Sequence, residues 1–160
     1  MPAHNAKVKV NPAEETIQVG GASIRFLVTG DNSNGSVALT ELTIPAGGRS
    51  AAPPHSHDGY EETIYGLEGV STWTVDGETI DVGPGQALCI PRGAVHGFIN
   101  HGDVDARALA TISPGVLGPA YFREMAAVIN AAAGGPPDRT KAVEVMRRHG
   151  LTPAPPPTSP

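Results

Sequence analysis

The chain has 160 residues, the size of one compact domain, and its 11 Lys and Arg against 16 Asp and Glu give a formal charge of −5. This mild acidity argues against nucleic acid or an anionic membrane as the main partner, and the single cysteine, Cys89, excludes an intrachain disulfide and a thiolate zinc cage. Gly and Pro number 20 and 16, and so many turn-forming residues favour short strands over a helix bundle.

The first fifteen residues are polar and are expected to form a loose N-terminal arm. They contain no apolar core like that of a signal peptide. The chain also contains no apolar run near the roughly 20 residues that a membrane helix requires. We therefore expect a cytoplasmic protein without a membrane partner.

Between residues 16 and 113 the sequence consists of short runs rich in Val, Ile, Thr and Leu, separated by turn dipeptides. Gly20-Gly21 and Asp76-Gly77 predict two hairpin turns. The expected strands are 16–19, 23–28, 37–44, 62–67, 70–75, 79–82, 87–90, 95–100 and 107–112. Turn signals recur about every 8 to 12 residues, which is typical of an all-β sandwich or barrel.

The periodicity becomes helical after residue 113. Apolar residues recur along one helix face at Tyr121, Phe122, Met125, Val128 and Ile129. A Gly-Gly-Pro-Pro run at 134–137 ends this helix, Asp138 can cap a second one, and Gly150 can end it. We expect residues 114–151 to form a helical extension that packs outside the barrel and has no chemical role. Residues 152–160 contain five prolines and are expected to form a disordered tail.

Four residues suggest a metal site: His55, His57, Glu62 and His96. His55 and His57 are two positions apart, so both point to one face of an extended strand. Only a fold that brings distant strands together can add His96. Three imidazoles and one carboxylate suit one divalent transition metal, namely Fe, Mn, Ni, Cu, Co or Zn. Four protein ligands on a six-coordinate metal leave two positions open, which a catalytic site needs.

These residues lie in two segments that resemble the signature motifs of the cupin superfamily. The first reads H-S-H, four residues, E, six residues, G over residues 55–69, and the second reads G, five residues, P-R-G, two residues, H, three residues, N over residues 85–100. The resemblance covers about residues 37–113. One departure is Arg49 at the position where the family has a turn-forming glycine, although Gly48 precedes it.

The resemblance implies an all-β fold, a double-stranded β-helix or jelly-roll cupin barrel at residues 16–113, followed here by a pair of short helices. It implies that His55, His57, Glu62 and His96 are the metal ligands. The motif spacing favours Glu62 over its neighbour Glu61, which must point to the opposite face of the strand. It also implies a homodimer paired through edge strands, for which residues 16–28 are the candidate.

Three functions are compatible with these residues. The helical extension resembles that of small bacterial quercetinase-like single-domain cupins, which implies a dioxygenase-like oxidoreductase acting on a small oxygen-rich organic substrate. The alternatives are a non-redox lyase or isomerase, in which Tyr60 or Glu62 moves a proton, and a small-molecule binding protein without turnover. Glu62 is expected to combine the roles of ligand and general base, and Tyr60 lies near enough to hydrogen-bond a substrate. The fold does not decide among these classes.

Overall fold

The computed structural model describes residues 10, 15–50 and 52–155. Its elements in chain order are β1 (Thr16–Val19), β2 (Ala22–Val28), β3 (Ala38–Ile44), β4 (His55–His57), β5 (Glu61–Glu68), β6 (Ser71–Val75), β7 (Glu78–Val82), β8 (Ala87–Ile90), β9 (His96–Ile99), β10 (Ala106–Ser113), α1 (Pro119–Asn130), α2 (Arg139–Arg148) and β11 (Leu151–Pro153). Each predicted strand is present with its ends moved by at most one residue. Two strands, β4 and β11, were not predicted.

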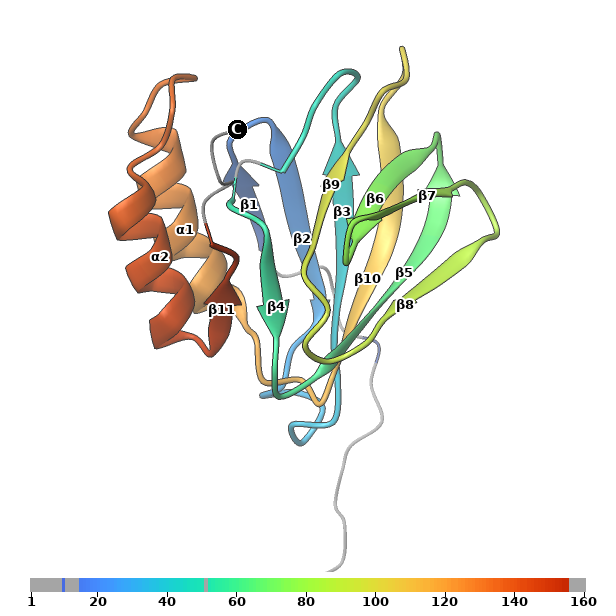
Figure 1. The fold of residues 1–160 in the computed structure, drawn as a ribbon. Coiled ribbons are helices and arrows are strands. Elements are labelled where there is room, and N and C mark those ends of the chain that lie inside the picture. The colour runs from blue at the N-terminus through green and yellow to red at the C-terminus, as the bar shows by residue number, and fades with distance from the viewer. Residues whose placement is uncertain (1–9, 11–14, 51, 156–160) are drawn as a thin grey trace, which may run out of the picture.

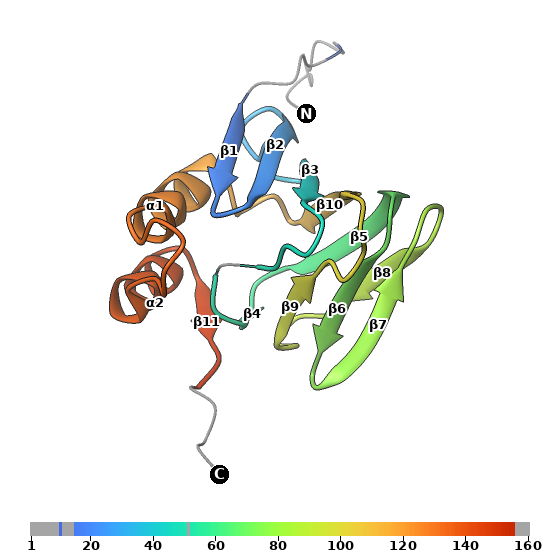
Figure 2. The ribbon, with the colours of Figure 1, turned by 90° about the horizontal axis from the view of Figure 1, so that it is seen from above.

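The strands form two antiparallel sheets that face each other as a jelly roll (Figures 1 and 2). The six-stranded sheet has the order β1-β2-β3-β10-β5-β8, and the five-stranded sheet has the order β11-β4-β9-β6-β7. The long crossovers place strands that are distant in sequence side by side. In particular, β4 pairs with β9 so that His55 lies opposite His96. The predicted all-β class, with two short helices after the barrel, is confirmed.

The barrel core follows from the alternation of side chains along each strand. The β3 sequence leaves two possible inner faces, and the structure buries the set that begins at Ala38 and ends at Ile44. The neighbouring strand β10 contributes mostly alanines, such as Ala108 and Ala110, to the interior. These small side chains leave space between the two sheets near the middle of the barrel.

The two helices lie beside β1 and β11, as Figure 2 shows. Asp138 caps α2 by accepting a hydrogen bond from the Lys141 backbone N–H at 3.1 Å. At the end of α1, the Asn130 side chain bonds both the Gln18 carbonyl and the Gly20 N–H at 2.9 Å. The helical extension is thereby attached to the edge strand β1. The predicted homodimer involves a second chain and stays a prediction.

The predicted disordered tail is wrong at its start, because Leu151–Pro153 form β11 against β4. Leu151 is only 2% exposed, and the Thr152 hydroxyl donates to the Asp58 carboxylate at 2.8 Å. β11 covers the edge that β4 would otherwise expose, and an edge strand tolerates proline. Residues 156–160 of the predicted tail, and residues 1–9 and 11–14 of the predicted arm, lie outside the described residues.

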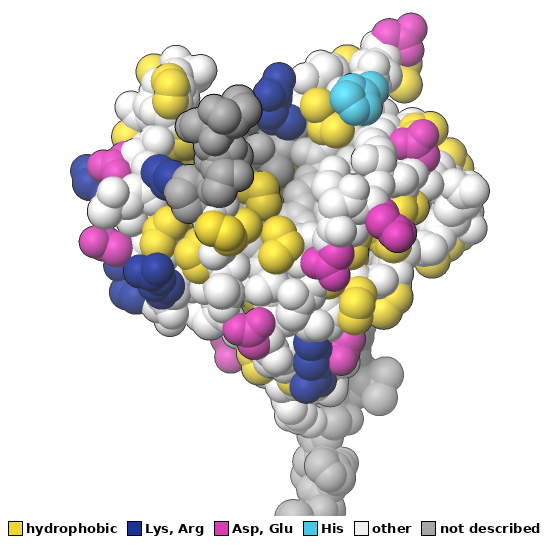
Figure 3. Space-filling model, in the orientation of Figure 1, with side chains coloured by type: hydrophobic (Ala, Val, Ile, Leu, Met, Phe, Trp, Pro, Cys, Tyr) yellow, Lys and Arg dark blue, Asp and Glu magenta, His cyan; other side chains and the backbone are white. Residues whose placement is uncertain are grey.

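Two features concern the helices and the charge of the surface. Neither helix in the described part of the chain has the length and apolar character that crossing a bilayer demands. On the face drawn in Figure 3, most Lys and Arg side chains lie at the left of the view, whereas Asp and Glu predominate at the right.

Candidate metal centre

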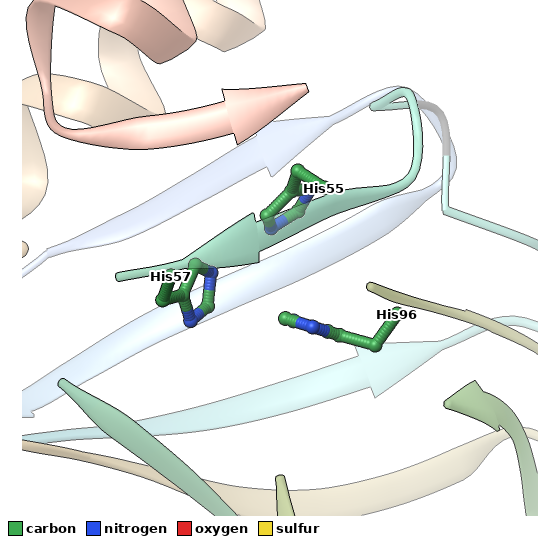
Figure 4. Close-up of side chains that lie close together, drawn as sticks. All are labelled: His55, His57 and His96. Carbon is green, nitrogen blue, oxygen red and sulfur yellow. The ribbon is translucent and has the colours of Figure 1, made fainter. Parts of the chain in front are cut away.

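Three histidine rings converge inside the barrel (Figure 4). His55 and His57 lie at the two ends of β4, and His96 is the first residue of β9. The ring centroids are 4.6 to 4.9 Å apart, and one ligand nitrogen from each ring lies within 4.8 Å of the others. The structure thus brings His96 next to His55 and His57, from which it is separated by about forty residues in the sequence.

Backbone carbonyls fix two of these rings. The Nδ1 atom of His55 lies 2.9 Å from the Pro53 oxygen, and that of His96 lies 3.0 Å from the Ala94 oxygen. In both cases Nδ1–H donates to a carbonyl two residues earlier in the chain, and in a neutral ring this leaves Nε2 without a proton. Such a partner orients a metal-binding imidazole and sets its tautomer. In its neutral form each of the two rings therefore presents an Nε2 atom that can bind a metal ion.

His57 provides a direct test of whether these residues fit a metal ion. Its side chain is 4% exposed, and its Nε2 atom is buried without a hydrogen-bond partner among the described residues. A buried polar atom left unpaired costs about 1 to 3 kcal/mol. Coordination of an ion between the three rings would use that nitrogen. The donor set therefore fits a divalent transition metal.

Glu62 adds a carboxylate next to two of the rings. Its Oε2 atom lies 3.2 Å from His96 Nε2 and 3.7 Å from His57 Nδ1. The neighbouring Glu61 is exposed and pairs with Arg92 at 2.7 Å. The alternation along β5 thus turns Glu62 inward and Glu61 outward. Glu62 contacts two of the three rings and is a candidate for the fourth ligand.

The burial of the site sets the protonation of its groups. Burial lowers the pKa of His55 to about 4 and that of His57 to about 3, so both rings are neutral at pH 7. For Glu62, burial opposes ionisation, but the hydrogen bond with His96 and the nearby rings hold its pKa below the ordinary value. Burial lowers the pKa of His96 as well, but the hydrogen bond with Glu62 outweighs this effect, and the pKa of His96 is raised. His55, His57 and the Glu62 carboxylate thus have the forms that coordinate a metal, whereas His96 would release the Nε2 proton that it shares with Glu62 on binding one.

The centre borders a cavity of about 100 Å³ between the two sheets and α1. Its walls are mainly apolar. The aromatic and long apolar side chains among them are Trp73, Phe98, Leu117, Tyr121, Phe122 and Met125. Since four of these residues belong to α1 or the turn before it, the prediction that the helices only cover the outside of the barrel is wrong for α1. The helical periodicity revealed a buried face, but it gave no signal that this face closes a cavity.

Tyr60 lies beside the metal centre and contacts one of its rings. Its side chain stacks on His57 with ring centroids 4.5 Å apart. Its hydroxyl is buried without a hydrogen-bond partner among the described residues, and burial raises its pKa. Tyr60 is absent from the residues that line the cavity. The structure therefore connects Tyr60 to the position of His57, and its predicted contact with substrate stays a prediction.

Comparisons with known proteins identify what this chain resembles. Residues 40–112 match the family model described as Cupin domain. The chain is 29% identical over 101 residues to quercetin 2,3-dioxygenase of Bacillus subtilis (strain 168), an alignment that covers 63% of this chain and 29% of that protein. It is 33% identical over 94 residues to polyketide synthase CurC of Streptomyces cyaneus, covering 59% of this chain and 60% of that protein. The chain therefore spans less than two thirds of either relative.

Among solved structures, KdgF from Halomonas sp. has a similar fold. The TM-score is 0.55 at 19% sequence identity, covering 63% of this chain and 86% of that one. Identity this low is evidence for the shared barrel alone.

Proposed function

Since this chain belongs to the cupin superfamily, with its cupin domain at residues 40–112, we propose that it is a metal-dependent, dioxygenase-like oxidoreductase acting on a small oxygen-rich organic substrate. One observation carries the proposal. His55, His57 and His96 converge beside Glu62 at the wall of an apolar cavity. A ligand set that fits a metal ion next to a space for an organic molecule is what an oxygenase requires.

The histidines and the apolar walls of the cavity have different proposed roles. The three histidines would hold the ion, and backbone carbonyls orient two of their rings, those of His55 and His96. A redox-active divalent metal supplies Lewis acidity and one-electron chemistry when bound. The apolar walls exclude water from the reacting groups, which strengthens electrostatic interactions and prevents side reactions. The similarity to a quercetin 2,3-dioxygenase supports this choice of reaction class.

Glu62 is proposed to serve as a ligand and as the base that takes the proton of a substrate hydroxyl. Its carboxylate is ionised and lies beside two imidazoles, and a positioned base contributes about 10²- to 10⁴-fold to a rate. Glu62→Gln keeps the side-chain size but removes the basicity. We expect turnover to fall about 100-fold or more, with a much smaller loss of bound metal. Equal losses of turnover and metal would leave Glu62 as a ligand only.

Oxygen consumption tests the proposed reaction class. Metal is first measured in protein purified without added metal. Metal-free protein is then loaded separately with Fe(II), Mn(II), Ni(II), Co(II), Cu(II) or Zn(II) and assayed with a panel of flavonols and catechols, with His96→Ala as the control. We expect oxygen uptake in step with substrate loss for at least one redox-active metal, and none for Zn(II) or for the control.

Two outcomes would overturn the proposal that the protein is an oxygenase. Equal conversion under nitrogen with Zn(II) would establish the non-redox lyase or isomerase. Retention of a small molecule without any conversion, with or without metal, would establish a binding protein.

A further inference from the structure

The charge of the cavity wall limits the substrate. Among the described residues that line the cavity, Glu62 is the only carboxylate and there is no Lys or Arg. An anionic group of the substrate placed away from the metal would therefore lose its hydration without gaining a cationic partner. Burying an unpaired charge is strongly unfavourable. The wall thus favours a substrate whose body is uncharged.

The hydrogen-bond donors of the wall are almost all in use. Thr40 and Ser50 donate their hydroxyls to backbone carbonyls at 3.4 and 3.2 Å. The indole N–H of Trp73 donates to the Ser71 hydroxyl at 2.9 Å. Tyr121 differs from them, because its hydroxyl has no hydrogen-bond partner among the described residues and, unlike that of Tyr60, is not fully buried, although the residue as a whole is only 4% exposed. An unpaired donor that can be reached from the cavity is what a ligand oxygen would satisfy.

Tyr121 is held in place by its neighbours on the two helices. Its ring packs edge-on against Phe122 and His149, with centroids 4.9 and 5.6 Å apart. Burial and the nearby Glu62 carboxylate both raise the pKa of its hydroxyl. The hydroxyl is therefore protonated at pH 7 and can donate a hydrogen bond. It comes from α1, outside the residues matched by the family model.

The size of the cavity limits the substrate to one ring at most. Its volume is about 100 Å³, which is smaller than the engineered apolar cavity of about 150 Å³ that holds benzene in another protein. Its walls include the rings of Trp73, Phe98 and Phe122, and such rings pack well against a planar ligand. A three-ring flavonol would extend beyond this space.

We propose that α1 completes a pocket for a neutral, single-ring hydroxylated aromatic compound, and that Tyr121 binds it by donating a hydrogen bond to one of its oxygens. This inference rests on the proposed function, since the same centre would bind the substrate. It concerns binding, however, and can be tested without turnover.

The test uses the full chain loaded with Zn(II) and kept under nitrogen, so that binding is measured without oxidation. Catechol is titrated by calorimetry, and quenching of Trp73, the single tryptophan, provides a second readout. We expect catechol to bind at least tenfold more tightly than 3,4-dihydroxybenzoate, which adds one carboxylate to the same ring. We also expect 3-hydroxyflavone to bind more weakly than catechol.

The variant Tyr121→Phe removes only the hydroxyl. We expect it to weaken catechol binding about tenfold, the size of one hydrogen bond, and to leave toluene binding unchanged, because toluene has no oxygen. The matched control Tyr65→Phe changes a tyrosine that is 44% exposed and absent from the cavity lining. It should change the affinity for neither catechol nor toluene.

Each opposite result would refute part of the inference. Dihydroxybenzoate binding as tightly as catechol would refute the neutral pocket, and equal catechol binding by Tyr121→Phe would refute the hydrogen bond. Catechol binding as described, without oxygen uptake in the assay above, would refute the oxygenase and leave the pocket intact. Oxygen uptake by the wild-type chain, together with unchanged catechol binding by Tyr121→Phe, would support the oxygenase and refute the role of Tyr121.

Discussion

Removing β11 tests whether the metal centre depends on the C-terminal strand. Strand β4 carries His55 and His57, and it pairs with β9 through one residue pair only, His55 with His96. Its other edge pairs with β11 through three residue pairs, among them Leu151 with His57. Within the sheet His57 is therefore paired with β11 alone, and its carbonyl also accepts a hydrogen bond from the Gly93 N–H at 2.9 Å. A chain that ends at Gly150 lacks this strand, and a chain that ends at Pro155 is the matched control because it keeps β11.

The expected magnitude follows from what β11 buries and bonds. Leu151 is 2% exposed, and burial of a leucine side chain contributes about 1.5 to 3 kcal/mol. The backbone hydrogen bonds of a three-residue pairing contribute about 0.5 to 1.5 kcal/mol each. We expect the chain ending at Gly150 to lose about 3 to 5 kcal/mol of unfolding free energy. Removing the partners of a metal ligand weakens metal binding by about 10- to 100-fold, and we expect a loss of that size here.

Two measurements check this prediction. Urea unfolding gives the free energy of each chain, and competition with a chelator gives the Zn(II) affinity of protein that circular dichroism shows to be folded. If the short chain does not fold, Leu151→Ala provides a milder change, for which a loss of about 2 to 5 kcal/mol is expected. Equal Zn(II) affinity in folded protein with and without an intact β11 would refute the reasoning.

Three other predictions concern single residues. His55→Ala should abolish stoichiometric metal binding, measured by elemental analysis, while circular dichroism stays unchanged. Asn100→Ala should lower the unfolding free energy in urea by about 2 to 4 kcal/mol, because this 1% exposed side chain donates to three backbone carbonyls. For Glu41, burial raises the pKa, but hydrogen bonds from Arg25 and Arg107 outweigh this effect and hold the pKa below its ordinary value of 4.5. Its ion pairs should therefore stabilise the fold by about 1 kcal/mol above pH 4.5. The difference in unfolding free energy between the wild-type chain and Glu41→Gln should disappear as the pH falls through the lowered pKa of Glu41. A difference that does not change with pH would contradict this prediction.

The strands could be predicted from the sequence because local signals and the fold agree. Alternating side chains and turn dipeptides define β6 and β7 on either side of Asp76-Gly77. The glycine at position 69 is equally informative, since its φ is +61° and an added Cβ would lie 2.5 Å from the Asp105 oxygen. Only glycine fits there, so its position in a motif indicates a particular backbone shape.

The two missed strands depend on their neighbours. β4 has three residues, too few for a period of two to stand out. β11 lies in a sequence whose proline content is typical of disorder, and it is ordered because β4 offers an unpaired edge. The inward position of Glu62 was predictable, because alternation allows only one of Glu61 and Glu62 to point inward and the motif spacing favours Glu62, whereas the place of Tyr121 on the cavity wall was not. A helix face can be recognised as buried without any local signal for what it is buried against.

The candidate metal ligands and the wall of the cavity therefore come from different parts of the chain. His55, His57, Glu62 and His96 all lie within residues 40–112, the part that matches the cupin model. The wall formed by α1 and the support formed by β11 lie beyond residue 112. A common ligand set fixes which ions can bind, while size, charge and hydrogen bonding of the wall select the substrate. The similarity in the barrel thus concerns the candidate metal ligands, and the proposed substrate has to be argued from residues outside it, such as Tyr121.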